Sequence, residues 1–143
     1  MTESSQGTWQ TVAILLARLI FAAIFLMATA FKFMDLNGTA TYIAAAGFPL
    51  ALPLAWIAAL FELALVIAFL TGAFFVEAAL LAAVYVVFLG FAFHGPSHWQ
   101  GSQAEFGSFI NHFTFCAGLL YAAVHGPGLV LALRHGVIGK SGG

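Results

Sequence analysis

The sequence predicts an all-α integral membrane protein: an antiparallel four-helix transmembrane bundle with a short interfacial helix after the first span. Of its 143 residues, 63% are hydrophobic and 6% are charged, whereas soluble domains carry about 25% charged residues. The apolar residues also fall into four runs, each near the roughly 20 residues that a helix needs to cross a bilayer. A chain of this kind lacks the polar side chains to cover a surface facing water.

Turn signals separate the four runs. The expected spans cover residues 11–31, 50–70, 73–93 and 108–125. Between the first two, Asn37-Gly38 is a turn signal, Thr39 is a candidate cap, and Gly47 with Pro49 ends a helix too short to cross. The expected organisation is a flexible N-terminus (1–10), a four-span domain (11–128) and a C-terminal tail (129–143).

Four spans place both termini on one side of the membrane. The tail carries Arg134 and Lys140, whereas the opposite loops carry only Lys32. The positive-inside rule therefore predicts cytoplasmic termini and outward-facing loops at 32–49 and 94–107. No basic run suggests a nucleic-acid partner.

Three ionisable residues inside the spans are the first candidates for function: Arg18, Glu62 and Glu77. When each is counted from the nearer end of its own span, Arg18 and Glu62 lie at nearly the same depth. A lone charge there costs about 3 kcal/mol or more, so the depth predicts an Arg18–Glu62 ion pair, with Glu77 nearby. Such a buried polar core either fixes helix register or lines a site for a quinone or a proton relay.

A second group gathers toward the outer face. Lys32 and Asp35 follow the first span, His94 ends the third, and Asn111 and His112 open the fourth. These are the candidate ligand-binding residues, because imidazole, ammonium and carboxylate groups suit a quinone head group. Asn111 shares a predicted inward stripe of the fourth helix with Phe115, Gly118 and Ala122.

We expect neither a metal nor a haem. Gly95-Pro96 breaks the helix that would align His94 with His98 as metal ligands. Depth alone would let His94 and His112 ligate a haem, but both are interpreted as amphipathic residues of the membrane interface. The lone Cys116 rules out an internal disulfide; it is either a small buried apolar residue or a thiol that handles sulfur species.

Several segments, in their order and spacing, resemble the DoxX family. They are the first-span run LLARLIFAAIFLMATAFKFMD, YIAAAGFP from Tyr42, AALFELALVIAFLTG around Glu62, His94 and Trp99, Asn111 with GLLYAA, and Gly126-Pro127-Gly128. By position, the resemblance implies that Arg18, Lys32, Glu62 and Asn111 correspond to functional residues of the family. Family members often continue after this last motif with a polar segment including Ser-Leu-Asp, whereas here residues 129–133 are apolar.

The resemblance implies a small four-span protein of the bacterial inner membrane. Some members accompany redox enzymes, as in thiosulfate:quinone oxidoreductase and in an oxidative-stress complex with superoxide dismutase and a sulfurtransferase. We therefore expect a quinone-linked subunit of a membrane redox system with quinone as its cofactor, surrounded by lipid and joined to a partner protein or to further copies of itself. The alternative is a non-catalytic assembly subunit whose buried charges set helix register and partner contacts.

Overall fold

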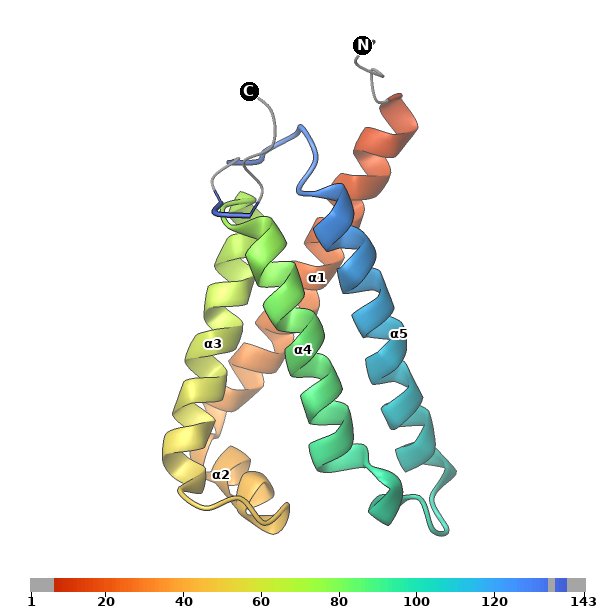
Figure 1. Ribbon diagram of the computed structural model, residues 1–143. Helices are drawn as coiled ribbons and strands as arrows, with labels where there is room; N and C mark the ends of the chain where they lie inside the picture. The colour runs from red at the N-terminus through yellow and green to blue at the C-terminus, as the bar shows by residue number, and fades with distance from the viewer. Residues whose placement is uncertain (1–6, 134–135, 139–143) are drawn as a thin grey trace.

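A computed structural model describes residues 7–133 and 136–138 of the chain. The described part is helical (Figure 1). Its elements are α1 (Thr8–Met34), α2 (Leu36–Ala45), α3 (Ala51–Thr71), α4 (Phe75–His94), the 3₁₀ helix η1 (Pro96–His98) and α5 (Gln103–His125).

The predicted fold class is confirmed. Helices α1, α3, α4 and α5 are each long and apolar enough to cross a membrane, and α2 is the short helix after the first span. The start of α1 and the end of α5 lie at one end of the bundle, here called the tail end (Figure 1). The opposite end, which carries α2 and η1, is called the α2 end.

Two helices begin at caps that the prediction did not identify. Helix α5 begins at Gln103 rather than at residue 108, because the Ser102 side chain caps it by accepting a hydrogen bond from the Glu105 N–H. At α2 the cap is Asp35, whose carboxylate accepts from the Gly38 N–H at 2.8 Å. Thr39 is not the cap: its hydroxyl donates back to the Asp35 carbonyl.

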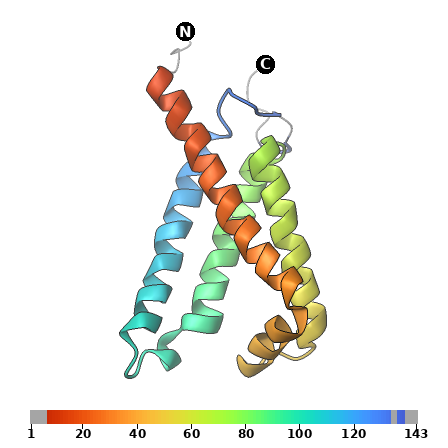
Figure 2. The ribbon, with the colours of Figure 1, turned by 180° about the vertical axis from the view of Figure 1, so that it is seen from behind.

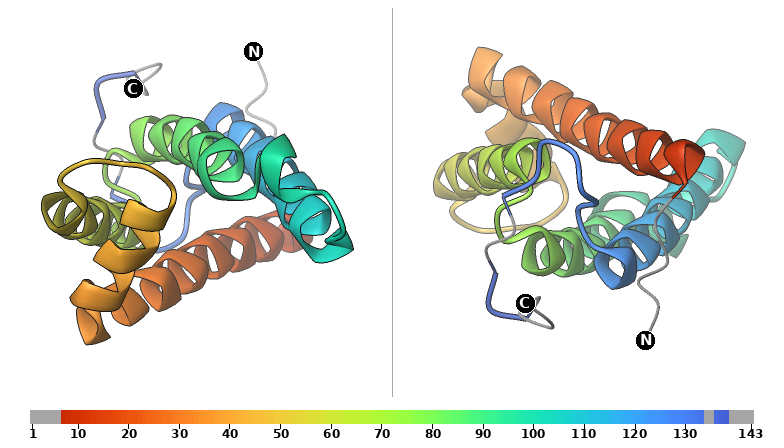
Figure 3. Two further views of the ribbon diagram at one scale, coloured as in Figure 1. Left: turned by 90° about the horizontal axis from the view of Figure 1, so that it is seen from below. Right: turned by 90° about the horizontal axis from the view of Figure 1, so that it is seen from above.

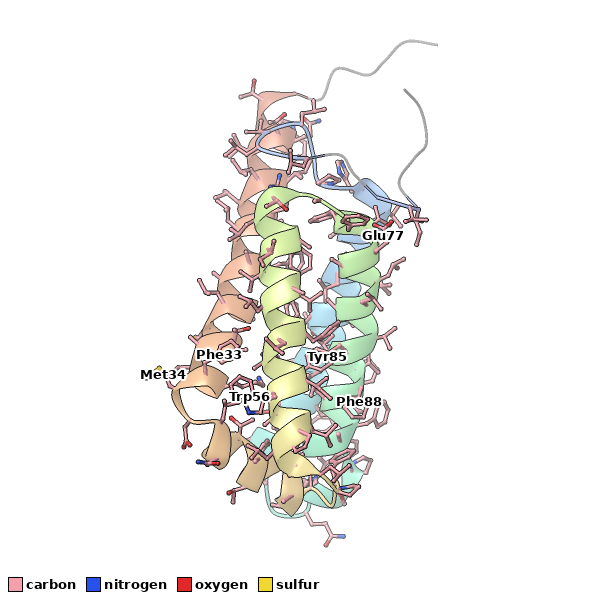
Figure 4. All side chains as sticks on the ribbon, turned by 90° about the vertical axis from the view of Figure 1, so that its left-hand side faces the viewer. Phe33, Met34, Trp56, Glu77, Tyr85 and Phe88 are labelled. Atoms are coloured by element: carbon pink, nitrogen blue, oxygen red, sulfur yellow. The ribbon has the colours of Figure 1, made fainter. Side chains whose placement is uncertain are left out.

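Helix α1 crosses the bundle obliquely, from α5 at the tail end toward α3 and α2 at the α2 end (Figure 2). Its Phe21 ring lies 5.5 Å from Phe115 of α5. Three turns later, its Phe33 ring lies 6.0 Å from Trp56 of α3 (Figure 4). The crossing separates α1 from α5 toward the α2 end.

Small residues and phenylalanines make the core. The small residues Ala55 and Ala59 of α3 and Ala78 and Ala82 of α4 are all buried, as close helix packing in a membrane requires. A Cβ atom added at Gly90 of α4 would lie 3.0 Å from the Cβ of His112, so α4 and α5 approach closely there.

The tail closes one end of the bundle. After α5, residues 126–133 run across the tail end to the end of α3 (Figure 3). The Leu133 N–H donates to the Thr71 carbonyl at 2.7 Å. Gly72, at φ +77°, lies against Ala132, where a Cβ would be 3.0 Å from the Ala132 Cα. The first residues of the tail are therefore part of the packed structure.

Candidate functional site

A charged network joins α1, α3 and α4. The Lys32 ammonium donates to both carboxylate oxygens of Glu62, at 2.9 Å and 2.8 Å, and the Tyr85 hydroxyl donates to the same carboxylate at 2.7 Å. Glu62 is 1% exposed, whereas the Lys32 side chain is 21% exposed. Because a buried charge is tolerated only when it is paired and hydrogen-bonded, the three side chains form one unit, here called the Lys32 network.

The predicted ion pair between Arg18 and Glu62 is wrong. Arg18 is 2% exposed, and all its hydrogen bonds go to backbone carbonyl oxygens instead. The acceptors are Phe69 at 3.0 Å, Leu70 at 2.8 Å, Pro127 at 3.0 Å, Val130 at 2.9 Å and Leu131 at 2.9 Å. A guanidinium has five N–H donors, so Arg18 is saturated.

The error comes from the height of α1. The prediction counted Arg18 and Glu62 from the ends of their own spans, as if both helices began at one level. Helix α1 starts at Thr8 and projects beyond the end of α3 (Figure 1). Arg18 therefore lies level with the last turn of α3, whose final carbonyl groups lack partners within the helix, and Lys32 is the cation that reaches Glu62.

Glu77 belongs to the tail end, away from the Lys32 network (Figure 4). Its carboxylate accepts hydrogen bonds from the backbone N–H groups of Val137 and Ile138, the latter at 2.8 Å. Together Arg18 and Glu77 hold the tail against α3 and α4. Their contacts are with backbone atoms and make a structural joint.

The Lys32 network borders a cavity of about 450 Å³ at the α2 end. Its lining residues come from α1, α2, α3, α4 and α5. The polar ones are Lys32, Thr39, Tyr42, Tyr85, His94 and His112, and the others include Ala28, Ile43, Ala58, Leu89 and Phe93. Three predicted ligand-binding residues, Lys32, His94 and His112, are thus brought together around one space.

The two histidines lie side by side, with ring centroids 5.3 Å apart. His94 Nδ1 is 2.7 Å from a carboxylate oxygen of Glu105. His112 Nδ1 is 2.7 Å from the Ser108 carbonyl oxygen. Each ring is oriented through its Nδ1, which is how proteins fix the role of the other ring nitrogen.

Tyr42 brings α2 to the same cavity. Its ring stacks on Phe93 of α4 with centroids 4.9 Å apart. Burial raises the pKa of the Tyr42 phenol, and the negative charge of Glu105 raises it further. The phenol therefore keeps its proton at neutral pH and can donate a hydrogen bond.

The other two predicted ligand-binding residues lie outside the cavity lining. Asp35 is exposed and caps α2. Asn111 is exposed on α5, although Phe115 and Gly118 on its predicted stripe do contact Phe21 of α1. Helix α1 leans toward α3 at the α2 end (Figure 2) and Asn111 is exposed, so the prediction that Asn111 points inward is wrong.

Sequence reasoning missed Tyr85 and Tyr42 as lining residues. The signal for Tyr85 was present, because it is a lone hydroxyl in the middle of an otherwise apolar span. For Tyr42 no periodic signal was available, since a ten-residue interfacial helix can lie on either side of the bundle. Cys116, half-buried, packs against the core and lies away from the cavity lining.

These features define a small multi-pass helical membrane protein with a polar cavity at one end. The DoxX family model matches residues 13–95, more than half of the chain, and the chain therefore belongs to the DoxX family. The match includes Arg18, Lys32, Glu62 and His94, while α5 lies beyond it. No curated protein and no solved structure matches the chain.

Proposed function

We propose that the protein binds the head group of a membrane quinone in the cavity beside Lys32, as a subunit of a redox system. The setting proposed is sulfur metabolism or oxidative stress, with a partner protein handling the electrons. The observation that carries the proposal is the cavity itself, a space of about 450 Å³ whose mostly apolar wall carries an ammonium, two imidazoles and three hydroxyl groups, in a chain with only 6% charged residues. Ligand sites in general combine an apolar wall with a few placed polar groups.

A second space beside the cavity supports a ligand with an apolar chain. This annex has a volume of about 310 Å³ and an apolar lining apart from the Tyr85 hydroxyl. Residues shared by both linings are Ile43, Ala58, Tyr85, Leu89 and Phe93. A polar head beside Lys32 with an isoprenoid chain in the annex would fill both spaces.

Lys32 is the group proposed to recognise the ligand. Its ammonium is held by Glu62 but keeps part of its surface open to the cavity. An ammonium beside a carbonyl oxygen donates a charge-assisted hydrogen bond, which is stronger than a neutral one. If the termini face the cytoplasm as the loop charges predict, the head group binds toward the outer leaflet.

A filling variant with a matched control tests the proposal. Ala28 lines the cavity, whereas Ala30, two residues along α1, is exposed on another face of the helix. We expect a decyl-tailed benzoquinone to raise the unfolding temperature of the purified protein, as any ligand of the native state does. Ala28→Phe should abolish this rise and Ala30→Phe should preserve it. No rise in the wild-type protein, or a rise that survives Ala28→Phe, contradicts quinone binding in this cavity.

The rival function is a non-catalytic assembly subunit. Arg18 favours it, because a guanidinium saturated by five backbone carbonyls serves architecture alone. The two functions separate in the complex with the partner protein. Under the rival, Ala28→Phe leaves both assembly and quinone-dependent activity intact; under quinone binding, the complex assembles but its activity is lost.

A further inference from the structure

The polar groups around the cavity differ in whether they can still donate or accept a hydrogen bond. Lys32 has three N–H groups, and its two contacts with Glu62 use two of them. One N–H remains for a ligand. The Tyr42 hydroxyl, which has no partner among the described residues, is the second donor on the wall.

His112 is an acceptor, because the Ser108 carbonyl oxygen that contacts its Nδ1 can only accept a hydrogen bond. The hydrogen of neutral His112 therefore sits on Nδ1 and the lone pair on Nε2. In its neutral form His94 also carries its hydrogen on Nδ1, because that nitrogen contacts a carboxylate oxygen, which can only accept. Neither Nε2 has a hydrogen-bond partner within the described part of the chain.

Two hydroxyl groups on the cavity wall already donate their hydrogens to acceptors within the protein. The Tyr85 hydroxyl donates to Glu62, and the Thr39 hydroxyl donates to the Asp35 carbonyl at 2.9 Å. What each offers the cavity is an oxygen lone pair. Together with the two imidazoles, they make the wall richer in acceptors than in donors.

We infer that this cavity binds the dihydroxy form of its ligand, a quinol, more tightly than the dicarbonyl form, the quinone. The inference rests on the proposed function, because it concerns which redox form of the same ligand is preferred. A quinol hydroxyl can donate to His112 Nε2 and still accept from Lys32. A quinone carbonyl only accepts, so beside the imidazoles it would leave two lone pairs facing each other without a hydrogen.

The imidazole pair does not by itself make a metal site. Among residues 7–133 and 136–138, no group of three His, Cys, Asp or Glu side chains is placed to hold a metal ion. The Lys32 ammonium lines the same space and would repel a cation. A neutral ligand with hydroxyl hydrogens meets neither difficulty.

Anaerobic titration of the purified wild-type protein tests the preference. The probes are a decyl-tailed hydroquinone, its quinone, and its dimethyl ether, which keeps the ring but has no hydroxyl hydrogen. We expect the hydroquinone to bind about tenfold more tightly than either of the others, the effect of one well-placed hydrogen bond. Tighter binding of the reduced form raises the midpoint potential of the bound quinone/quinol couple. A tenfold ratio of the two dissociation constants corresponds to a rise of about 30 mV for a two-electron couple.

Two variants assign the effect to the cavity. His112→Phe keeps a ring against Gly90 and removes the acceptor, so it should reduce the preference to about twofold or less. His98→Phe is the matched control, because His98 is exposed on η1 and does not line the cavity; it should keep the full preference.

Different results would overturn different claims. Equal binding of hydroquinone and quinone by the wild-type protein overturns the inference and leaves the proposed function intact. A preference that persists in His112→Phe overturns the role given to the imidazole. Binding of none of the three probes overturns the proposed function, and the inference with it.

Discussion

Helix α1 carries one basic side chain toward each end of the bundle, Arg18 buried and Lys32 partly exposed, and the two are bound in opposite ways. Arg18 at the tail end donates to five backbone carbonyls and has no hydrogen-bonding capacity left. Lys32 is paired with one carboxylate and keeps a donor facing a cavity. A saturated charge can only hold structure, whereas an unsaturated one beside a space can also recognise a ligand. The comparison separates the structural end of the molecule from the end that we propose binds quinone.

The largest effect is expected at the saturated end. Arg18→Ala leaves five carbonyl oxygens without their donor, and each buried unsatisfied acceptor costs about 1–3 kcal/mol. After relaxation and water entry, we expect a loss of at least about 4 kcal/mol in the free energy of unfolding. Thermal unfolding in detergent measures it. Arg18→Lys keeps the charge with fewer donors and should recover only part of the loss; full recovery would mean that charge, not geometry, matters at this site.

An intermediate effect is expected at the Lys32 network. Glu62→Gln removes the counter-ion of Lys32, which can partly rehydrate because it is 21% exposed, so we expect a loss of about 2 kcal/mol. The double variant Lys32→Met with Glu62→Gln should regain most of that stability while binding quinone poorly. Unfolding curves and quinone titration on the same samples test both statements. Wild-type quinone affinity in the double variant would show that the network serves helix register alone.

The smallest effect is expected where Glu77 holds the tail. Glu77→Gln weakens two hydrogen bonds to the Val137 and Ile138 N–H groups, for a loss of about 1 kcal/mol or less. Amide hydrogen exchange should quicken at those two residues, with the unfolding temperature nearly unchanged. Glu105→Gln, at the α2 end, is the control and should leave exchange in the tail as it was. A large drop in unfolding temperature in Glu77→Gln would place Glu77 in the main core.

The sequence predicted the spans well because hydrophobic length and turn residues are local signals. It also placed Lys32, His94 and His112 at one end of the bundle, because each lies at or near the end of its predicted span on the same side. The pairing of charges failed because it depends on the relative height and tilt of helices, which no local pattern encodes. The prediction for Asn111 was wrong for the same reason. Phe115 and Gly118 on its stripe do lie against α1, but the tilt carries α1 away from α5 toward the α2 end, where Asn111 lies.

The hydrogen bonds of Arg18 also bear on how the protein is made. Its partners Pro127, Val130 and Leu131 are synthesised more than a hundred residues after it. Until they leave the ribosome, the first helix carries a guanidinium in the membrane with much of its donor capacity unmet. The nascent bundle therefore stays incomplete until residue 131 has left the ribosome, and a chain truncated before Pro127 lacks the acceptors for three of the five N–H groups of Arg18.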